Sequence, residues 1–309
     1  MAKVSEVCRW IGLNEALREF ALATHGTTSQ RHIKPLHWYI ASRLCLEGGF
    51  NPDEITPRPP FVVEVTGRGS HRKRTIHFDP KAGGSGELTI LGGLKTKQVD
   101  VVVTKKDIGP IIAVSMKGTL NALRNLTNRL EEAGGDCTNL HMTYPSLVYA
   151  YWAVIRANRP GPVPRNAPST LQSADGMIRS NDIAVLADGQ PHQAVLRYHL
   201  ALSGLTNRAG LRNELSKYEA VALTLVEGDE QSVGSVFKEF PPPDNPLHFS
   251  NLMPTIYEQY DLRFVHQAPD MKKLTWRNGW SEDSPALKKW KHAEYTPRLV
   301  TAEGDAATV

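Results

Sequence analysis

The chain has 309 residues, of which 40% are hydrophobic and 22% charged, and its formal net charge is +4. This composition is ordinary for a globular protein, and a chain of this length buries a core that needs no disulfide or metal staples. The slight basic excess permits a polyanionic partner but does not require one.

The first part of the chain predicts two helices followed by strands. Apolar residues spaced for one face predict a helix up to about Ala23, and Lys34–Leu46 predicts a second helix that Gly48 and Gly49 end. Runs rich in Val and Ile, punctuated by glycine, then predict strands. The segments are 61–65, 75–78, 86–91, 97–103 and 110–117, the first two joined as a hairpin by the basic stretch GRGSHRKR.

The second part predicts helices that alternate with strands. A helix at 118–133 is expected to end at Gly134-Gly135, and a further helix is expected at 147–157, before the proline-rich loop NRPGPVPRNAPST. The remaining predictions are helices at 190–203, 209–218 and 249–260, and strands at 220–226 and 262–265. This pattern predicts an α/β (α+β) fold, with a mixed central β-sheet flanked by helices.

We expect one domain over residues 1–298, with a core at about 34–133 and helical and strand additions over 144–298. The tail at 299–309 is small and polar in composition and is expected to be disordered. The proline-rich loop is compatible with an interdomain linker or with a long excursion inside one domain.

The cysteines Cys8, Cys45 and Cys137 are odd in number and widely spaced, so they build neither a zinc pattern nor a disulfide framework. A reducing compartment fits such a set. The polar N-terminal segment lacks the apolar stretch of a signal peptide, and no apolar run reaches the length of a membrane span. We therefore expect a cytoplasmic protein with no membrane partner.

Two charged residues interrupt the most apolar strands. Asp100 lies within KQVDVVV, Lys117 ends PIIAVSMK, and a short turn joins the two. An ionised aspartate in so apolar a strand is costly to bury unless it has a partner. A carboxylate and a lysine on adjacent strands, with a carboxylate on the next helix, can hold a divalent metal ion and a water against a phosphate. The pattern indicates a metal-dependent phosphodiesterase; a plain Asp–Lys pair on a half-exposed strand is the structural alternative.

This order of residues resembles the PD-(D/E)xK nuclease superfamily, which includes most type II restriction endonucleases. Asp100 follows Val99 where the family has Pro-Asp, and Ser115-Met116-Lys117 stands where the family has acid-x-Lys. The type II enzymes that cut around a CCGG core also carry Ser-x-Lys, and a glutamate on the following helix replaces the missing acid. Glu131, fourteen residues after Lys117, is similar in placement. The resemblance covers roughly residues 34–133 and implies a restriction-endonuclease-like core.

The resemblance implies a catalytic set of Asp100, Ser115, Lys117 and Glu131 around Mg²⁺. Asp100 would bind the metal and bridge it to the scissile phosphate, with the Met116 backbone carbonyl as a further oxygen ligand. Glu131 would supply the displaced carboxylate, although helix phase does not separate it from its neighbour Glu132. Lys117 would orient or deprotonate the attacking water and stabilise charge in the transition state.

Four other residues were weighed as metal ligands. Glu47 on the upstream helix could complete such a site, with a solvated helix end as its alternative. Asp107 lies in the turn KKDIGP, where aspartate is common for local hydrogen bonding. His32 and His37 have helical spacing but Pro35 intervenes and no third ligand is evident, so both are expected to be structural or exposed.

Basic residues supply the candidate contacts to DNA, and a solvated surface is the alternative for each. In the resembling group, polar and arginine side chains from the helix after the lysine reach base edges. A run of basic residues can follow the phosphate backbone of DNA. Basic residues interleaved with tryptophan are also suited to binding nucleic acids. These candidates are Arg124, Arg129, Arg68, Arg72, Lys73, Arg74, Lys272, Lys273 and Arg277.

The expected function is therefore a Mg²⁺-dependent, sequence-specific endonuclease of the type II restriction class that cuts double-stranded DNA. A homodimer or a tetramer is expected, because a palindromic site is read by two-fold symmetry. One alternative is a DNA-binding protein on the same scaffold that no longer cleaves, which Ser115 favours. Another is a repair or junction nuclease that reads DNA structure. No nucleotide-binding loop, dinucleotide fingerprint or G-x-S-x-G elbow is present.

Overall fold

The computed structural model describes residues 6–23, 31–68, 72–121, 123–168, 171, 173–290 and 299–300, with Arg124, Leu299 and Val300 described by their backbone alone. Most of the tail predicted to be disordered, 301–309, lies outside the described residues. None of the helices within these ranges pairs the length with the apolar character that a bilayer crossing needs.

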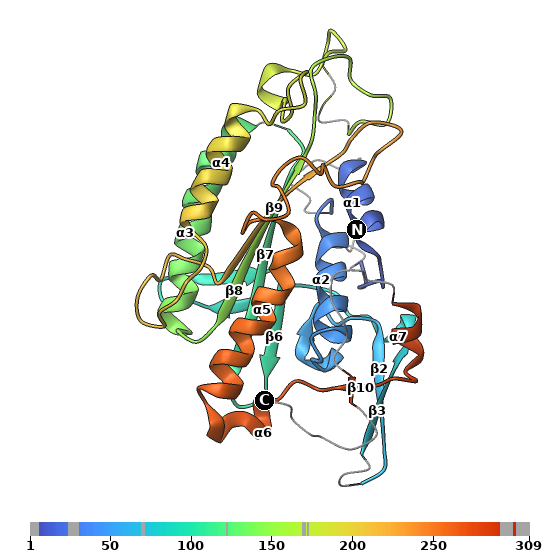
Figure 1. Ribbon diagram of the computed structural model, residues 1–309, viewed down its shortest axis with the longest axis vertical. Helices are drawn as coiled ribbons and strands as arrows, with labels where there is room; N and C mark the ends of the chain where they lie inside the picture. The colour runs from blue at the N-terminus through green and yellow to red at the C-terminus, as the bar shows by residue number, and fades with distance from the viewer. Residues whose placement is uncertain are drawn as a thin grey trace, which may run out of the picture.

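Five strands form one mixed sheet in the order β1-β6-β7-β8-β9 (Figure 1). The strands are β1 (Ile55–Thr56), β6 (Val101–Lys105), β7 (Gly109–Thr119), β8 (Val148–Arg156) and β9 (Ala220–Val226). β6 is antiparallel to both β1 and β7, whereas β7, β8 and β9 are parallel to one another. The predicted mixed central sheet is confirmed, and β8 and β9 carry it well beyond the core boundary predicted at residue 133.

Helices cover both faces of this sheet (Figure 1). One face packs against α3 (Leu126–Thr143) and α4 (Gln193–Gly204); the other packs against α2 (Lys34–Leu46) and α5 (Leu252–Tyr260), with α1 (Leu13–Ala21) beside α2. Successive side chains of β8 alternate between these two cores, as the pleat requires: Trp152 faces α2 and α5, and Tyr151 faces α3 and α4. The whole strand is therefore buried.

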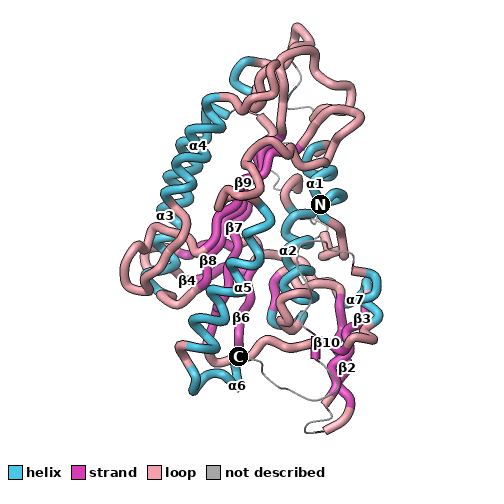
Figure 2. The backbone as a smooth tube through the Cα atoms, viewed as in Figure 1, coloured by secondary structure: helices cyan, strands magenta, loops and turns pink. Residues whose placement is uncertain are grey.

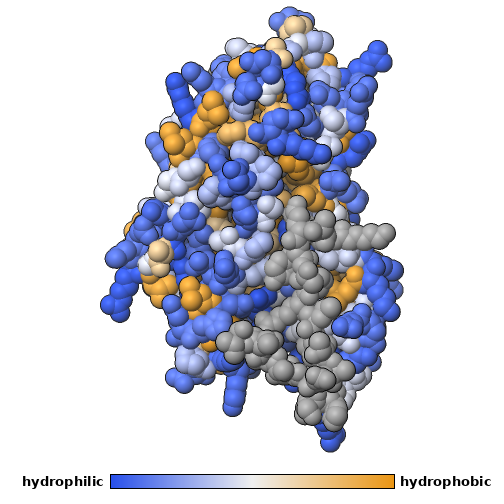
Figure 3. Space-filling view, viewed as in Figure 1, coloured by the Kyte–Doolittle hydropathy of each residue, from blue (hydrophilic) through white to orange (hydrophobic). Residues whose placement is uncertain are grey.

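Smaller elements surround the sheet (Figure 2). β2 (Phe61–Thr66) and β3 (Lys73–Phe78) form an antiparallel hairpin, as predicted, and β4 (Leu88–Leu91) pairs with β5 (Thr96–Val99). The C-terminal part adds α6 (Lys272–Thr275), β10 (Trp280–Ser281), α7 (Pro285–Lys289) and β11 (Leu299–Val300). The face seen in Figure 3 is mostly hydrophilic, with apolar side chains in small scattered groups.

Several helix predictions are confirmed and others are wrong. α2 has the predicted bounds, α5 lies within its predicted segment, α4 ends one residue beyond its predicted segment, and the N-terminal helix begins only at Leu13. The helix predicted at 147–157 is strand β8, because a strand buried on both faces reads as a continuous apolar run that periodicity alone does not separate from a buried helix.

Three further predictions are corrected. The helix predicted at 118–133 starts at Leu126 and runs through Gly134 and Gly135 to Thr143, since nothing crowds these glycines and the apolar face continues. The strand predicted at 262–265 is a π-helical extension of α5, Asp261–His266. Residues 209–218 form turns and not the predicted helix.

Candidate metal centre

Asp100 stands at a break between two strands. The predicted strand 97–103 is divided into β5 and β6, and Asp100 lies between them. Its Oδ2 accepts a hydrogen bond of 2.6 Å from the backbone N–H of Met116 on β7, so the carboxylate is fixed against the strand that carries Lys117. Burial raises the pKa of Asp100 to about 6, although the Met116 N–H and the charge of Lys117 act in the opposite direction.

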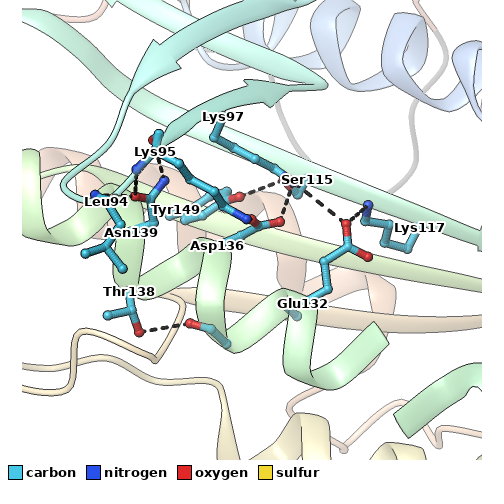
Figure 4. A network of polar contacts seen from close by, with 12 residues as sticks. Leu94, Lys95, Lys97, Ser115, Lys117, Glu132, Asp136, Thr138, Asn139 and Tyr149 are labelled. Atoms are coloured by element: carbon cyan, nitrogen blue, oxygen red, sulfur yellow. Dashed lines mark hydrogen bonds and ion pairs between the residues drawn. The ribbon is translucent and has the colours of Figure 1, made fainter. Parts of the chain in front are cut away.

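Lys117, near the end of β7, points toward helix α3. Its Nζ lies 2.9 Å from Oε1 of Glu132, and Figure 4 shows the two side chains facing each other. Lys97 on β5 approaches the same oxygen at 3.9 Å and also pairs with the buried Asp136. Burial acts to raise the pKa of Glu132, but the hydrogen bond from Lys117 and the charges of Lys117, Lys97 and Arg129 together outweigh it, and the pKa lies below its usual value.

The neighbouring Glu131 is exposed. Successive residues of an α-helix differ in direction by about 100° at 3.6 residues per turn, so Glu131 and Glu132 cannot share one contact. Both glutamates are exposed, and within the described residues it is Glu132, the alternative that the sequence left open, that contacts Lys117.

A histidine and a second glutamate meet Asp100 from its other side. His37 Nε2 lies 3.6 Å from Asp100 Oδ1, and one potential ligand atom each of His37, Glu87 and Asp100 lies within 4.8 Å of the other two. His37 comes from α2, and Glu87 immediately precedes β4. The side chain of His37 is only 3% exposed, and its Nε2 has no hydrogen-bond partner among the described residues. Such a set can hold a divalent cation.

The electrostatics of this cluster are those of uncompensated negative charge. Burial raises the pKa of Glu87, and the nearby Asp100 carboxylate raises it further. Burial lowers the pKa of His37 to about 4, so the imidazole is neutral at pH 7 and keeps a lone pair. The charges of Lys34 and Lys117 act on the pKa values of His37 and Glu87, and the charge of Lys117 also lowers that of Asp100.

His37 was expected to be structural or exposed, and Glu87 was not considered. A histidine on a helix that is buried on nearly every side shows no periodicity that would reveal its neighbours. Glu87 lies in the segment GGSGELT, which carries no motif. The only available signal was the absence of an acid at position 115, which requires another carboxylate from elsewhere in the chain.

Ser115 and Glu47 lie outside this cluster. Ser115 Oγ lies 2.7 Å from Tyr149 Oη in the core beneath α3, so this hydroxyl is engaged in packing (Figure 4). Glu47 is fully buried at the end of α2, where Arg43 Nε donates to it at 2.8 Å. Its assignment as a metal ligand is therefore corrected to a structural ion pair. Asp107 has a φ of 65° in the β6–β7 turn, which confirms its turn role.

The predicted DNA contacts are dispersed. Arg277 is buried against Asp261, with Nε and Oδ1 2.8 Å apart, and donates to the Gly48 carbonyl, so its assignment to DNA is corrected to a structural role. Lys272 Nζ lies 4.9 Å from the centre of the Trp276 ring, and Lys73 pairs with Asp283 at 2.6 Å.

None of the other candidates whose side chains are described is buried. Those that are exposed or half-buried are Arg68, Arg72, Arg74, Arg129 and Lys273. The side chain of Arg124 lies outside what is described. Exposed cations on the β2–β3 hairpin, and the exposed Lys272 and Lys273, are thus available to a polyanion, whereas Arg277 is committed to packing.

The residues assembled around Asp100 fit a divalent cation. They offer carboxylate oxygens and a neutral imidazole nitrogen, and a lysine stands beside them. No protein-family model, curated protein or solved structure matches this chain.

Proposed function

We propose that this protein is a metal-dependent endonuclease that hydrolyses phosphodiester bonds in double-stranded DNA. The observation that carries the proposal is the convergence of Asp100, Lys117 and Glu132 from the β6–β7 hairpin and the following helix. The order of Asp100 and Lys117 on adjacent antiparallel strands supports the resemblance to the PD-(D/E)xK nucleases. Glu87, which lies in the cluster with Asp100, would supply the carboxylate that Ser115 lacks, whereas Glu132 pairs with Lys117.

The residues divide the chemistry between them. Asp100, with Glu87 and His37, would hold the cation, which supplies Lewis-acid stabilisation of phosphate charge and lowers the pKa of a bound water. Lys117 presents a positive charge beside the cluster, suited to orient the attacking water and to stabilise the charge that develops on phosphate oxygens. Glu132 holds the amine of Lys117 in place at 2.9 Å.

The same proposal implies a DNA-binding surface, an oligomeric state and a cellular location. The exposed Arg68 and Arg72, at the end of the β2–β3 hairpin, are available to follow a phosphate backbone. A sequence-specific enzyme of this type would act as a homodimer or tetramer on a palindromic site, in the cytoplasm.

The test is DNA cleavage by the purified protein. Plasmid and phage DNA are incubated with the protein in Mg²⁺, in Mn²⁺ and in EDTA, and the products are resolved by electrophoresis. Discrete fragments that require a metal support a sequence-specific enzyme. Cutting confined to branched substrates would instead indicate a nuclease that reads structure, and DNA that is retarded but intact would indicate a binding protein.

A matched pair of variants assigns the activity to the site. Lys117→Ala should abolish cutting and leave DNA retardation in place. Lys106→Ala removes an exposed lysine from the β6–β7 turn, at the other end of the hairpin from Lys117, and should cut like the wild type. Full activity of the Lys117 variant would refute the site.

A further inference from the structure

The nitrogen of His37 distinguishes this cluster from one that offers oxygen alone. Its Nε2 is the nearest histidine atom to the Asp100 carboxylate, at 3.6 Å, which is too long for a hydrogen bond. The side chain is only 3% exposed and this nitrogen lacks a hydrogen-bond partner within the described part of the chain. A buried polar atom without a partner costs free energy, and a metal bond would remove that cost.

The charge around the site also calls for a cation. Asp100 and Glu87 bring two carboxylates within 4.8 Å of the imidazole. Lys34 and Lys117 supply positive charge near Glu87, but the amine of Lys117 is engaged by Glu132 at 2.9 Å and offsets the pair only in part. The negative charge of the pair is therefore left for a bound ion.

The type of ligand selects the type of ion. Mg²⁺ is a hard ion that binds oxygen and keeps several waters, whereas imidazole suits first-row transition ions. A set of one imidazole and two carboxylates is mixed, and Mn²⁺ accepts both kinds of ligand. Mg²⁺ would use the oxygens and gain little from the nitrogen.

We propose that His37 is a direct metal ligand, with Asp100 and Glu87, and that it makes the site selective for a divalent transition-metal ion such as Mn²⁺ over Mg²⁺. This inference rests on the metal site of the proposed function and revises the ion expected there. It does not depend on DNA cleavage, because metal binding is measured on the protein alone.

The experiment uses electron paramagnetic resonance of the full-length protein with Mn²⁺ and no DNA. Titration gives the Mn²⁺ affinity, and pulsed spectra report whether a ¹⁴N nucleus is bonded to the ion. We expect one Mn²⁺ site with a directly bonded ¹⁴N. Affinity for Mg²⁺ is obtained by competition in the same titration.

Variants identify the residue that supplies the ¹⁴N bonded to Mn²⁺. His37→Gln should remove the ¹⁴N signal and weaken Mn²⁺ binding by about tenfold or more, while Mg²⁺ binding changes by less than about threefold. His77→Gln, on the β2–β3 hairpin and half-exposed, serves as the matched control and should retain both. Asp100→Asn should weaken both ions. Circular dichroism confirms that each variant is folded.

Each result decides between the possibilities. A wild-type site that binds Mn²⁺ without a bonded ¹⁴N overturns the proposal, even if the His37 variant fails to fold. Equal loss of Mn²⁺ and Mg²⁺ affinity in a folded His37→Gln protein also overturns the selectivity. A protein that binds neither ion contradicts the metal site and the proposed function together. A bonded ¹⁴N without DNA cleavage upholds the inference and rejects only the nuclease.

Discussion

Two clusters beside the central sheet each combine a buried carboxylate with a histidine, but only the first also contains arginines. In the first, the buried Glu219 lies 3.0 Å from Arg208 and 2.8 Å from Arg263. The backbone N–H of Tyr149 also donates to it at 2.7 Å, and His141 lies 3.5 Å away. In the second cluster, Asp100 accepts one backbone hydrogen bond and faces a further carboxylate and an imidazole.

The pKa values record this difference. Burial alone would raise the pKa of Glu219, but His141 and Arg263, together with the peptide N–H, bring it below its usual value. Burial raises the pKa of Asp100 to about 6, and the Met116 N–H and the charges of Lys117 and Lys97 offset this rise only in part. A buried carboxylate whose charge is balanced by neighbouring groups stabilises the fold. A buried carboxylate whose charge is not balanced is kept in place by the rest of the fold and is a candidate catalytic or metal-binding group. The arginines that balance Glu219, and their absence from the Asp100 cluster, separate the two regions.

The largest expected effect is on stability, at Glu219. Glu219→Gln would leave Arg208 and Arg263 buried without a counter-charge and should lower the free energy of unfolding by roughly 3–5 kcal/mol. Urea denaturation of the variant and the wild type measures this difference. A loss below about 1 kcal/mol would show that the first cluster is not a structural ion network.

Asp100→Asn should have the opposite effect to Glu219→Gln, with no loss of stability and a large loss of DNA cleavage. The variant removes a poorly compensated buried charge, so the free energy of unfolding of the metal-free protein at pH 7 should be unchanged or higher. DNA cleavage should fall by at least about 10²-fold, because a bound cation contributes several kcal/mol to stabilising the transition state. Cleavage at the wild-type rate, or a protein destabilised as much as Glu219→Gln, would remove the distinction between the clusters.

Glu131 and Glu132 form a matched pair within the second cluster. Glu132→Gln weakens the hold on Lys117 and should reduce cleavage by roughly 10–100-fold, as for residues that orient a ligand. Glu131→Gln changes an exposed side chain and should remain within about threefold of the wild type. Single-turnover cleavage rates on one DNA substrate give the comparison, and the opposite order would restore the assignment predicted from the sequence.

Ser115→Ala should give the smallest effect. The hydroxyl lies 2.7 Å from Tyr149 Oη, and its loss should lower the free energy of unfolding by about 1 kcal/mol. Cleavage should be unchanged, since this serine faces the core. A large loss of cleavage in a stable Ser115→Ala protein would make Ser115 a catalytic residue after all.

The sequence predicted the parts of the site that depend on neighbours in the chain. Asp100 and Lys117 lie on strands joined by a turn of a few residues, and the turn chemistry around Asp107 fixes their pairing. Alternation along β7 then directs Lys117 to the face that α3 covers. Local rules were sufficient for this pair.

The remaining ligands come from long-range packing that no local pattern records. His37 reaches Asp100 because α2 packs on the sheet, and Glu87 reaches it because the segment before β4 passes the same edge. The choice between Glu131 and Glu132 depends on how α3 packs against the sheet, and α3 begins at Leu126 and not at the predicted residue 118. β8 was misread for a related reason, since burial on both faces removes the alternation that identifies a strand.

The central claim is that uncompensated charge at Asp100 marks a metal centre. Anomalous X-ray diffraction from crystals grown with Mn²⁺ tests it most directly, because the ion is located without reference to activity. The account predicts an anomalous peak bonded to Asp100, Glu87 and His37, and none beside Glu219. A peak elsewhere, or a water hydrogen-bonded between Asp100 and His37 in its place, would contradict it.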